Sequence, residues 1–244
     1  MKISSTNTIS ETKIKALVAG FSGSGKTTQA RFLKEFKPLV ISAESGLLSL
    51  QGAGIDYIDV SKDDEGKLIP KEMRVKRLME VYQYVLKPET QAKYNLLYLD
   101  SLTEMSQVLF DALRKEYPER KDNLVLYGEL GQKMRDIIKA FRDAPHYHVV
   151  MTCLCTVDKD ETTGKRFMAF DLIGGIKDKL AQYFDLVLYL RVNDDKKREL
   201  VCQQTDTITA KDRSGKLDLL EVADLGAVFK KAMGVTLVTT GVNK

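Results

Sequence analysis

Scarce residue types exclude several classes of protein. The 244 residues include three cysteines and two histidines. An odd and small number of cysteines cannot form a disulfide framework and favours a reducing compartment. Because both histidines lie close to Pro145, no Ser/His/Asp triad is readable. The sequence also lacks an apolar run near the roughly 20 residues of a membrane helix, and residues 1–8 lack a hydrophobic signal core, so we expect a cytoplasmic protein with no membrane partner.

The charge balance and length suit one globular domain. Lys and Arg number 38 against 34 Asp and Glu, which gives a formal net charge of +4. This mildly basic balance permits contact with nucleic acid but does not by itself indicate it. No Pro/Gly-rich linker or internal repeat divides the chain. We therefore expect a flexible N-terminal tail over residues 1–12 and a single domain over residues 13–244.

The hydrophobic pattern predicts an α/β fold. Apolar runs that lack alternation are typical of strands covered on both faces, and amphipathic segments separate them. We expect a mostly parallel central sheet flanked by helices, with an antiparallel C-terminal edge. The predicted strands cover residues 16–19, 39–41, 57–60, 96–99, 149–151, 186–190, 199–204 and 217–222. The predicted helices cover residues 25–36, 70–86, 103–116, 123–143 and 224–232.

A phosphate-binding loop follows the first predicted strand. Residues Gly20–Thr27 read GFSGSGKT and match G-x-x-x-x-G-K-[ST] at every fixed position. Glycines allow successive backbone N–H groups to surround an anion at the start of a helix. Lys26 would reach the β- and γ-phosphates, and the Thr27 hydroxyl would bind Mg²⁺. The predicted nucleotide-binding residues are Gly20, Ser22, Gly23, Ser24, Gly25, Lys26, Thr27 and Thr28.

One carboxylate and one candidate base complete the predicted site. Asp100 ends the apolar run Leu96–Leu99, as in a Walker B strand, and would hold Mg²⁺ together with Thr27. Ser101 follows it, whereas AAA+ machines usually have a catalytic Glu there, so the sequence argues against that class. Glu44, directly after another predicted strand, is then the candidate that polarises the attacking water. The alternative is a solvated Glu44 or a contact at the start of the following turn.

Three segments together resemble the core of RecA-like ATPases: Gly20–Thr28, Ser42–Glu44 and Leu96–Ser101. Val149–Thr152 resembles the strand that ends in a polar sensor in those proteins, and this places Thr152 in the sensor role. Ala210–Gly215 is similar to the A-K-x-R-x-G segment of DnaB-type helicases and to a segment of RadA. The resemblance covers roughly residues 13–232 and implies a RecA-like P-loop fold that uses ATP and Mg²⁺.

The resemblance also implies assembly. In such relatives the Lys and Arg of the last segment reach the ATP site of a neighbouring subunit. Arg213 would then act as an arginine finger in trans, with Lys211 as its companion, in a ring or filament. The alternative is a charged hairpin turn. The compact chain looks most like phage-encoded ATPases of single-strand annealing and recombination, which would work in the bacterial cytoplasm, with a single-strand-binding protein as a possible partner.

Two segments are candidates for contact with single-stranded DNA. One is the basic stretch Arg114–Lys121, which includes Lys121. The other is the predicted loop Val157–Phe170, where Lys165, Arg166 and Phe167 combine cations with an aromatic ring. Because acidic residues lie in the second segment, a solvated turn explains its charges equally well.

The leading hypothesis is a Mg²⁺-dependent, DNA-stimulated ATPase, in which Lys26, Glu44, Asp100, Lys211 and Arg213 carry the chemistry. One alternative is a small-molecule or nucleotide kinase, which would need arginines over an acceptor phosphate. A second alternative is an ATP-responsive DNA-binding adapter in which Glu44 is not catalytic. Cys153 and Cys155 form a C-x-C pair without a second ligand pair, so we expect them to pack in the core rather than to bind metal.

Overall fold

The computed structural model describes residues 13–117 and 123–235. The expected tail over residues 1–12 and the candidate DNA contact Lys121 lie outside these residues. The strands run over β1 Lys15–Gly20, β2 Pro38–Ser42, β3 Asp56–Asp59, β4 Leu96–Asp100, β5 His148–Lys159, β6 Arg166–Phe170, β7 Leu186–Val192, β8 Arg198–Val201, β9 Lys211–Asp212 and β10 Leu220–Val222. The helices are α1 Lys71–Val85, α2 Pro88–Lys93, α3 Leu102–Glu116, α4 Asn123–Arg142 and α5 Leu225–Met233, with 3-10 helices η2 Thr27–Phe36, η3 Leu47–Leu50 and η4 Lys177–Tyr183.

A mostly parallel sheet forms the centre of the molecule. Its order is β10-β8-β7-β1-β5-β4-β2-β3, with β6 beside β5 and β9 beside β7. The strands from β7 to β3 run parallel to their neighbours, whereas β8 and β10 form an antiparallel edge. Every residue of β2 and β4 is buried, as consecutive apolar positions predict for strands covered on both faces. The predicted α/β class, with its parallel centre and antiparallel C-terminal edge, is confirmed.

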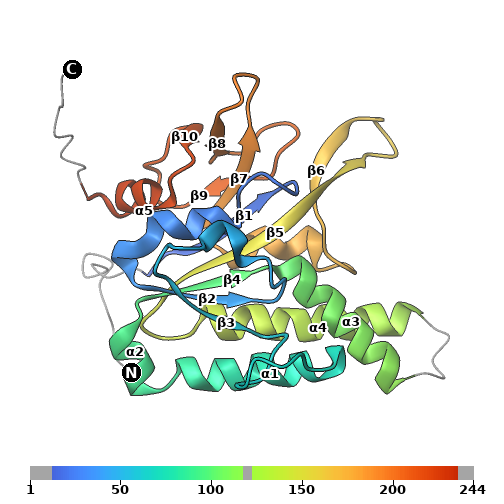
Figure 1. The fold of residues 1–244 in the computed structure, drawn as a ribbon. Coiled ribbons are helices and arrows are strands. Elements are labelled where there is room, and N and C mark those ends of the chain that lie inside the picture. The colour runs from blue at the N-terminus through green and yellow to red at the C-terminus, as the bar shows by residue number, and fades with distance from the viewer. Residues whose placement is uncertain (1–12, 118–122, 236–244) are drawn as a thin grey trace, which may run out of the picture.

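Helices cover both faces of this sheet. Figure 1 shows α1, α3 and α4 on one face and η2 and α5 on the other. Two hydrophobic clusters correspond to these faces: one joins α1, α3 and α4 to the sheet, and the other joins η2 and α5 to it. Side chains alternate along each strand, so that Leu17 belongs to the first cluster and Ala16 and Val18 to the second.

The helix that follows the phosphate-binding loop differs from the expected type. It is a 3-10 helix over Thr27–Phe36 rather than an α-helix over residues 25–36. The sequence pattern could not separate these two, because Ala30, Leu33 and Phe36 repeat every three residues, and side chains three apart share one face in either helix.

The expected loop Val157–Phe170 is instead a long β-hairpin. Strand β5 extends to Lys159, and β6 returns beside it, with Lys159 opposite Arg166. The backbone N–H of Asp160 donates to the carbonyl of Lys165 at 2.9 Å, and Gly164 has a φ of +71° in the turn. Charged residues on a solvent-exposed hairpin resemble a loop in sequence, and this is why the pattern predicted no strand. We call residues 155–170 the β5–β6 hairpin.

Candidate nucleotide site at the carboxyl end of the sheet

The phosphate-binding loop Gly20–Thr27 connects β1 to η2 at the carboxyl end of the parallel strands. A Cβ on Gly20 would lie 2.4 Å from the carbonyl oxygen of Leu190 on β7, so only glycine fits between these strands. Gly23 and Gly25 have φ values of +77° and +101°, which other residues rarely adopt. These three glycines let the backbone curl tightly at the end of the strand.

The interior of this loop fits a phosphate chain. The hydroxyl of Ser24 is buried without a hydrogen-bond partner in the described residues. The ammonium of Lys26 is also buried, and donates to the carbonyls of Gly20 and Phe21, each at 3.0 Å. Burial lowers the pKa of Lys26, an effect that the carboxylates of Asp100 and Glu44 oppose. An unpaired hydroxyl beside a buried cation, at the start of a helix, is a donor set suited to phosphate oxygens.

Asp100 lies where the metal of such a site is bound. Its carboxylate accepts a hydrogen bond from the Thr27 hydroxyl at 2.6 Å and another from the Thr152 hydroxyl. Asp100 is 3% exposed at the end of β4. A carboxylate and a hydroxyl are oxygen ligands of the type that Mg²⁺ prefers, so these residues fit a magnesium ion. The structure therefore brings together the predicted loop, the predicted metal ligands and the predicted sensor Thr152.

Glu44 reaches the same edge through Ser101. Strands β2 and β4 are neighbours, with Ser42 opposite Asp100, so the residues after both strands emerge side by side. The Ser101 hydroxyl donates to the Glu44 carboxylate and accepts from the backbone N–H of Glu104, which caps α3. Ser101 is a residue whose role the sequence interpretation missed, because it was considered only as the absence of an acid.

Two further side chains hold the loop from outside. The hydroxyl of Tyr98 on β4 donates to the carbonyl of Lys26 at 2.5 Å, and burial raises the pKa of Tyr98 well above its ordinary value. The Nε of Arg198 on β8 donates to the carbonyl of Ser24 at 2.9 Å. Sequence reasoning missed both. Tyr98 lies within an apolar run, so the sequence indicates only a buried core residue. Arg198 lies 174 positions from Ser24 and belongs to no motif.

An aromatic contact connects the loop to the β5–β6 hairpin. Phe21, at the beginning of the loop, packs edge to face against Tyr189 of β7, with ring centroids 6.5 Å apart. The Tyr189 hydroxyl lies 3.3 Å from the sulfur of Met168 on β6. These two contacts form a continuous path of side chains from the loop to the hairpin.

Lys211 and Arg213 are not brought to the loop of their own chain. Strand β9 pairs with the beginning of β7, where Asp212 lies opposite Leu186, whereas the loop lies beside Leu190 further along β7. Lys211 donates to the carbonyl of Ala181 at 2.6 Å, and burial lowers its pKa. Arg213 forms an ion pair with Asp185 at 3.3 Å.

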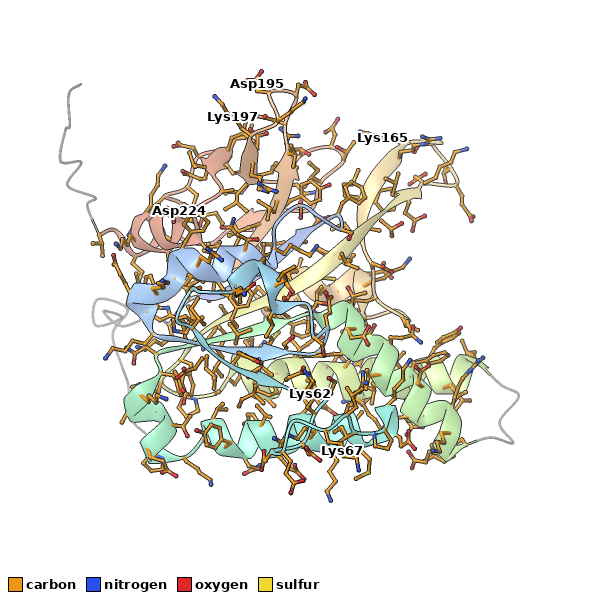
Figure 2. The ribbon with its side chains drawn as sticks, in the orientation of Figure 1. Lys62, Lys67, Lys165, Asp195, Lys197 and Asp224 are labelled. Carbon is orange, nitrogen blue, oxygen red and sulfur yellow. The ribbon has the colours of Figure 1, made fainter. Side chains whose placement is uncertain are left out.

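The predicted DNA contacts lie on the β5–β6 hairpin. Figure 2 shows Lys165 at its outer end. Arg166 is exposed, Phe167 is 36% exposed, and Lys165 pairs with Asp206 at 3.0 Å. These residues are thus accessible but separate from the nucleotide site.

Three further findings concern metal sites, the cysteines and membrane spans. Over residues 13–117 and 123–235, no three His, Cys, Asp or Glu side chains gather into a metal site. Cys153 and Cys155 are buried in the core, and burial raises the pKa of each thiol to about 12. Among the helices that the structure describes, none has both the length and the apolar character to cross a membrane.

Comparison with known proteins places the chain in a family. A model of the family described as an AAA domain matches residues 12–214. The chain belongs to the AAA domain family. This AAA domain is a P-loop ATPase domain, as the loop predicted.

Solved structures with a similar fold include an ATPase and a recombinase. The first is an ATPase of the type III secretion system of pathogenic bacteria, with 16% identity and a TM-score of 0.47 over 73% of this chain and 52% of that chain. The second is the RadB recombinase, with 16% identity and a TM-score of 0.41 over 78% of this chain and 80% of that chain. The AAA domain described here thus spans about half the length of the secretion ATPase. None of the curated proteins matches it.

Proposed function

We propose that this AAA domain hydrolyses Mg²⁺-bound ATP and couples hydrolysis to single-stranded DNA. The nucleotide part of the proposal depends on one contact between the phosphate-binding loop and the Walker B strand. There the Thr27 hydroxyl donates to the Asp100 carboxylate at 2.6 Å. This contact supports a shared role for the two residues at one metal-bound triphosphate.

The residues around the loop have distinct roles in this proposal. The backbone N–H groups of the loop and the ammonium of Lys26 bind the phosphates, and Thr27 and Asp100 hold Mg²⁺. The bound ion neutralises charge on the phosphate oxygens. Glu44 orients the attacking water, and the Ser101 hydroxyl holds the Glu44 carboxylate in place. Thr152 fixes the second oxygen of Asp100 and connects the metal ligand to β5.

The β5–β6 hairpin supports the DNA part of the proposal. Lys159 and Arg166 lie directly opposite each other, so their side chains share one face of the hairpin. Like charges in this position repel unless an anion lies between them. Two of the nearby acids are engaged elsewhere, since Asp158 pairs with Lys177 and Asp160 accepts backbone N–H groups of its own turn. Phe167, one position along β6, faces the other side of the hairpin, where its exposed ring offers a surface on which a base can stack.

The position of the hairpin offers a route for coupling. Strand β5 lies next to β1, with Leu154 opposite Gly20, and extends to Lys159. At about 3.3 Å per residue, this carries the hairpin roughly 16 Å beyond the phosphate-binding loop. The contacts from Met168 through Tyr189 to Phe21 connect the two sites. DNA bound to the hairpin would therefore change the position of the loop.

We further propose that subunits assemble so that ATP lies between them, with Lys211 and Arg213 serving the neighbouring site. Their place beside the beginning of β7, away from the loop of their own chain, supports a role in trans. A task in phage recombination or single-strand annealing, together with a single-strand-binding protein, is the biological setting that we propose.

The test is the rate of ATP hydrolysis with and without single-stranded DNA, for the natural chain and for Lys26→Ala. We expect DNA to raise the rate several-fold and Lys26→Ala to abolish hydrolysis while it unfolds at a similar temperature. Unchanged hydrolysis in Lys26→Ala would contradict the assignment of the loop. Phosphate transfer to a small acceptor would favour the kinase, and DNA binding that responds to ATP without turnover would favour the adapter.

A further inference from the structure

Arg198 occupies an unusual position beside the phosphate-binding loop. It is exposed to solvent at the start of β8, yet its Nε donates a hydrogen bond of 2.9 Å to the carbonyl oxygen of Ser24. The same Nε lies 3.0 Å from where a Cβ on Gly25 would be. The side chain is thus packed directly against the peptide that joins Ser24 to Gly25.

Arg198 has no acidic partner in the part of the chain that the structure describes. Its neighbour Glu199 is occupied by Arg191 at 2.7 Å and by Asn193 at 3.1 Å. Adjacent residues of a strand face opposite sides, so Glu199 points away from the loop. Among the described residues, Arg198 thus has no carboxylate partner and instead donates to one carbonyl of the loop. Its position is therefore not explained by a surface ion pair.

Peptide geometry gives the explanation. In a trans peptide the C=O and the following N–H point in opposite directions. Holding the Ser24 carbonyl towards Arg198 therefore directs the Gly25 N–H to the other side of the peptide, away from Arg198. Gly25 has a φ of +101° and no Cβ to restrict its backbone, so a hydrogen bond to this peptide limits a freedom that other residues would lack.

We propose that Arg198 is a positioning residue for the nucleotide's phosphates. It fixes the Ser24–Gly25 peptide so that the Gly25 N–H is ready to donate to a phosphate oxygen before ATP arrives. This inference rests on the proposed nucleotide site. It assigns a role in phosphate binding to a residue of β8, at the antiparallel edge of the same chain. This residue lies outside the sequence motif of the loop.

The test compares two variants of matched shape on one hairpin. Arg198→Met removes the donor at Ser24 with little change in volume, and Arg191→Met removes an equal charge that faces Glu199. Isothermal calorimetry with Mg²⁺-bound ATP and with ADP measures affinity. We expect Arg198→Met to weaken both nucleotides about tenfold, the size of one charge-assisted hydrogen bond, and Arg191→Met to leave them unchanged. Arg198→Lys, which keeps a cationic donor, should restore most of the affinity.

A second readout separates positioning from mere structure. In protein labelled with ¹⁵N-glycine, the Gly25 amide resonance should shift in unliganded Arg198→Met and return towards its natural position in Arg198→Lys. Equal affinities for Arg198→Met, Arg191→Met and the natural chain would overturn the inference while leaving the proposed function intact. A natural chain that binds neither nucleotide would overturn both.

Discussion

Asp100 illustrates how single residues in the site depend on one another. Its two carboxylate oxygens accept hydrogen bonds from hydroxyls of different elements, Thr27 at the start of η2 and Thr152 on β5. Because all three side chains are at least partly buried, each hydrogen bond is made in a setting where an unpaired polar group is costly. The arrangement holds both oxygens of the carboxylate that we propose as a metal ligand.

A change at Glu44 tests the proposed base. Glu44→Gln keeps an oxygen that can accept from the Ser101 hydroxyl but removes the negative charge that polarises water. We expect turnover to fall about 100-fold or more, with ATP affinity within about threefold of the natural chain. Glu65→Gln, in an exposed turn, is the matched control. Full turnover in Glu44→Gln would favour the alternative of a solvated carboxylate.

His148 makes stability depend on pH. Burial, with help from Lys13 and Lys15, lowers its pKa to about 4 from an ordinary 6.5, and its Nδ1 accepts from the backbone N–H of Ile14 at 3.1 Å. Between these pH values the unfolded chain binds the proton and the folded chain does not. The free energy of unfolding should therefore fall by about 3 kcal/mol as pH drops from 6.5 to 4.

Urea unfolding at several pH values measures this effect. His148→Gln can still accept from the Ile14 N–H but cannot titrate, so its stability should vary less over the same range. His146→Gln, at the exposed histidine two positions away, should keep the natural pH dependence. Equal slopes in the two variants would show that other groups cause the loss.

At the level of elements, the β5–β6 hairpin carries the DNA hypothesis. Replacing Lys159 and Arg166 with Gln removes the opposed cations but keeps two polar side chains. We expect weaker binding of single-stranded DNA, with the slope of log affinity against log salt reduced by about 1.4 for two lost phosphate contacts. The control makes the same change to Gln at Lys62 and Lys67, which Figure 2 shows far from the hairpin that carries Lys165. Equal losses in both double variants would contradict a specific role for the hairpin.

The elements that the sequence predicted well are those with a strong hydrophobic pattern. Strands β1, β4 and β7 are apolar at successive positions, and α3 lies within one residue of its expected bounds, starting after Ser101 caps it. The β5–β6 hairpin was missed because its strand pairing depends on a tight turn and on backbone hydrogen bonds rather than on burial.

The site was predictable where residues are close in sequence or follow a strand. Two sequence motifs, each with a known local geometry, contain the loop glycines, Lys26, Thr27 and Asp100. Arg198 and Tyr98 could not be predicted, because their role depends on which strands become neighbours. That order is a property of the folded sheet, and no local pattern encodes it.

At the level of the whole molecule, assembly decides whether Arg213 is catalytic. Mixing Arg213→Ala with Glu44→Gln should restore part of the lost activity, because hybrid interfaces combine an intact Arg213 with an intact Glu44. We expect the mixture to exceed the sum of the separate rates, as measured by phosphate release. Lys216→Ala, at an exposed position near the same turn, should stay active alone. A mixture no faster than that sum would count against a shared site.

The contact between Phe21 and Tyr189 has a practical consequence. The chain contains no tryptophan, and Phe21 is 41% exposed at the beginning of the phosphate-binding loop. An indole introduced by Phe21→Trp would be the sole strong fluorophore and would rest on the Tyr189 ring. Its emission would then report changes in the surroundings of the loop when nucleotide is added, in stopped-flow mixing, without any attached dye.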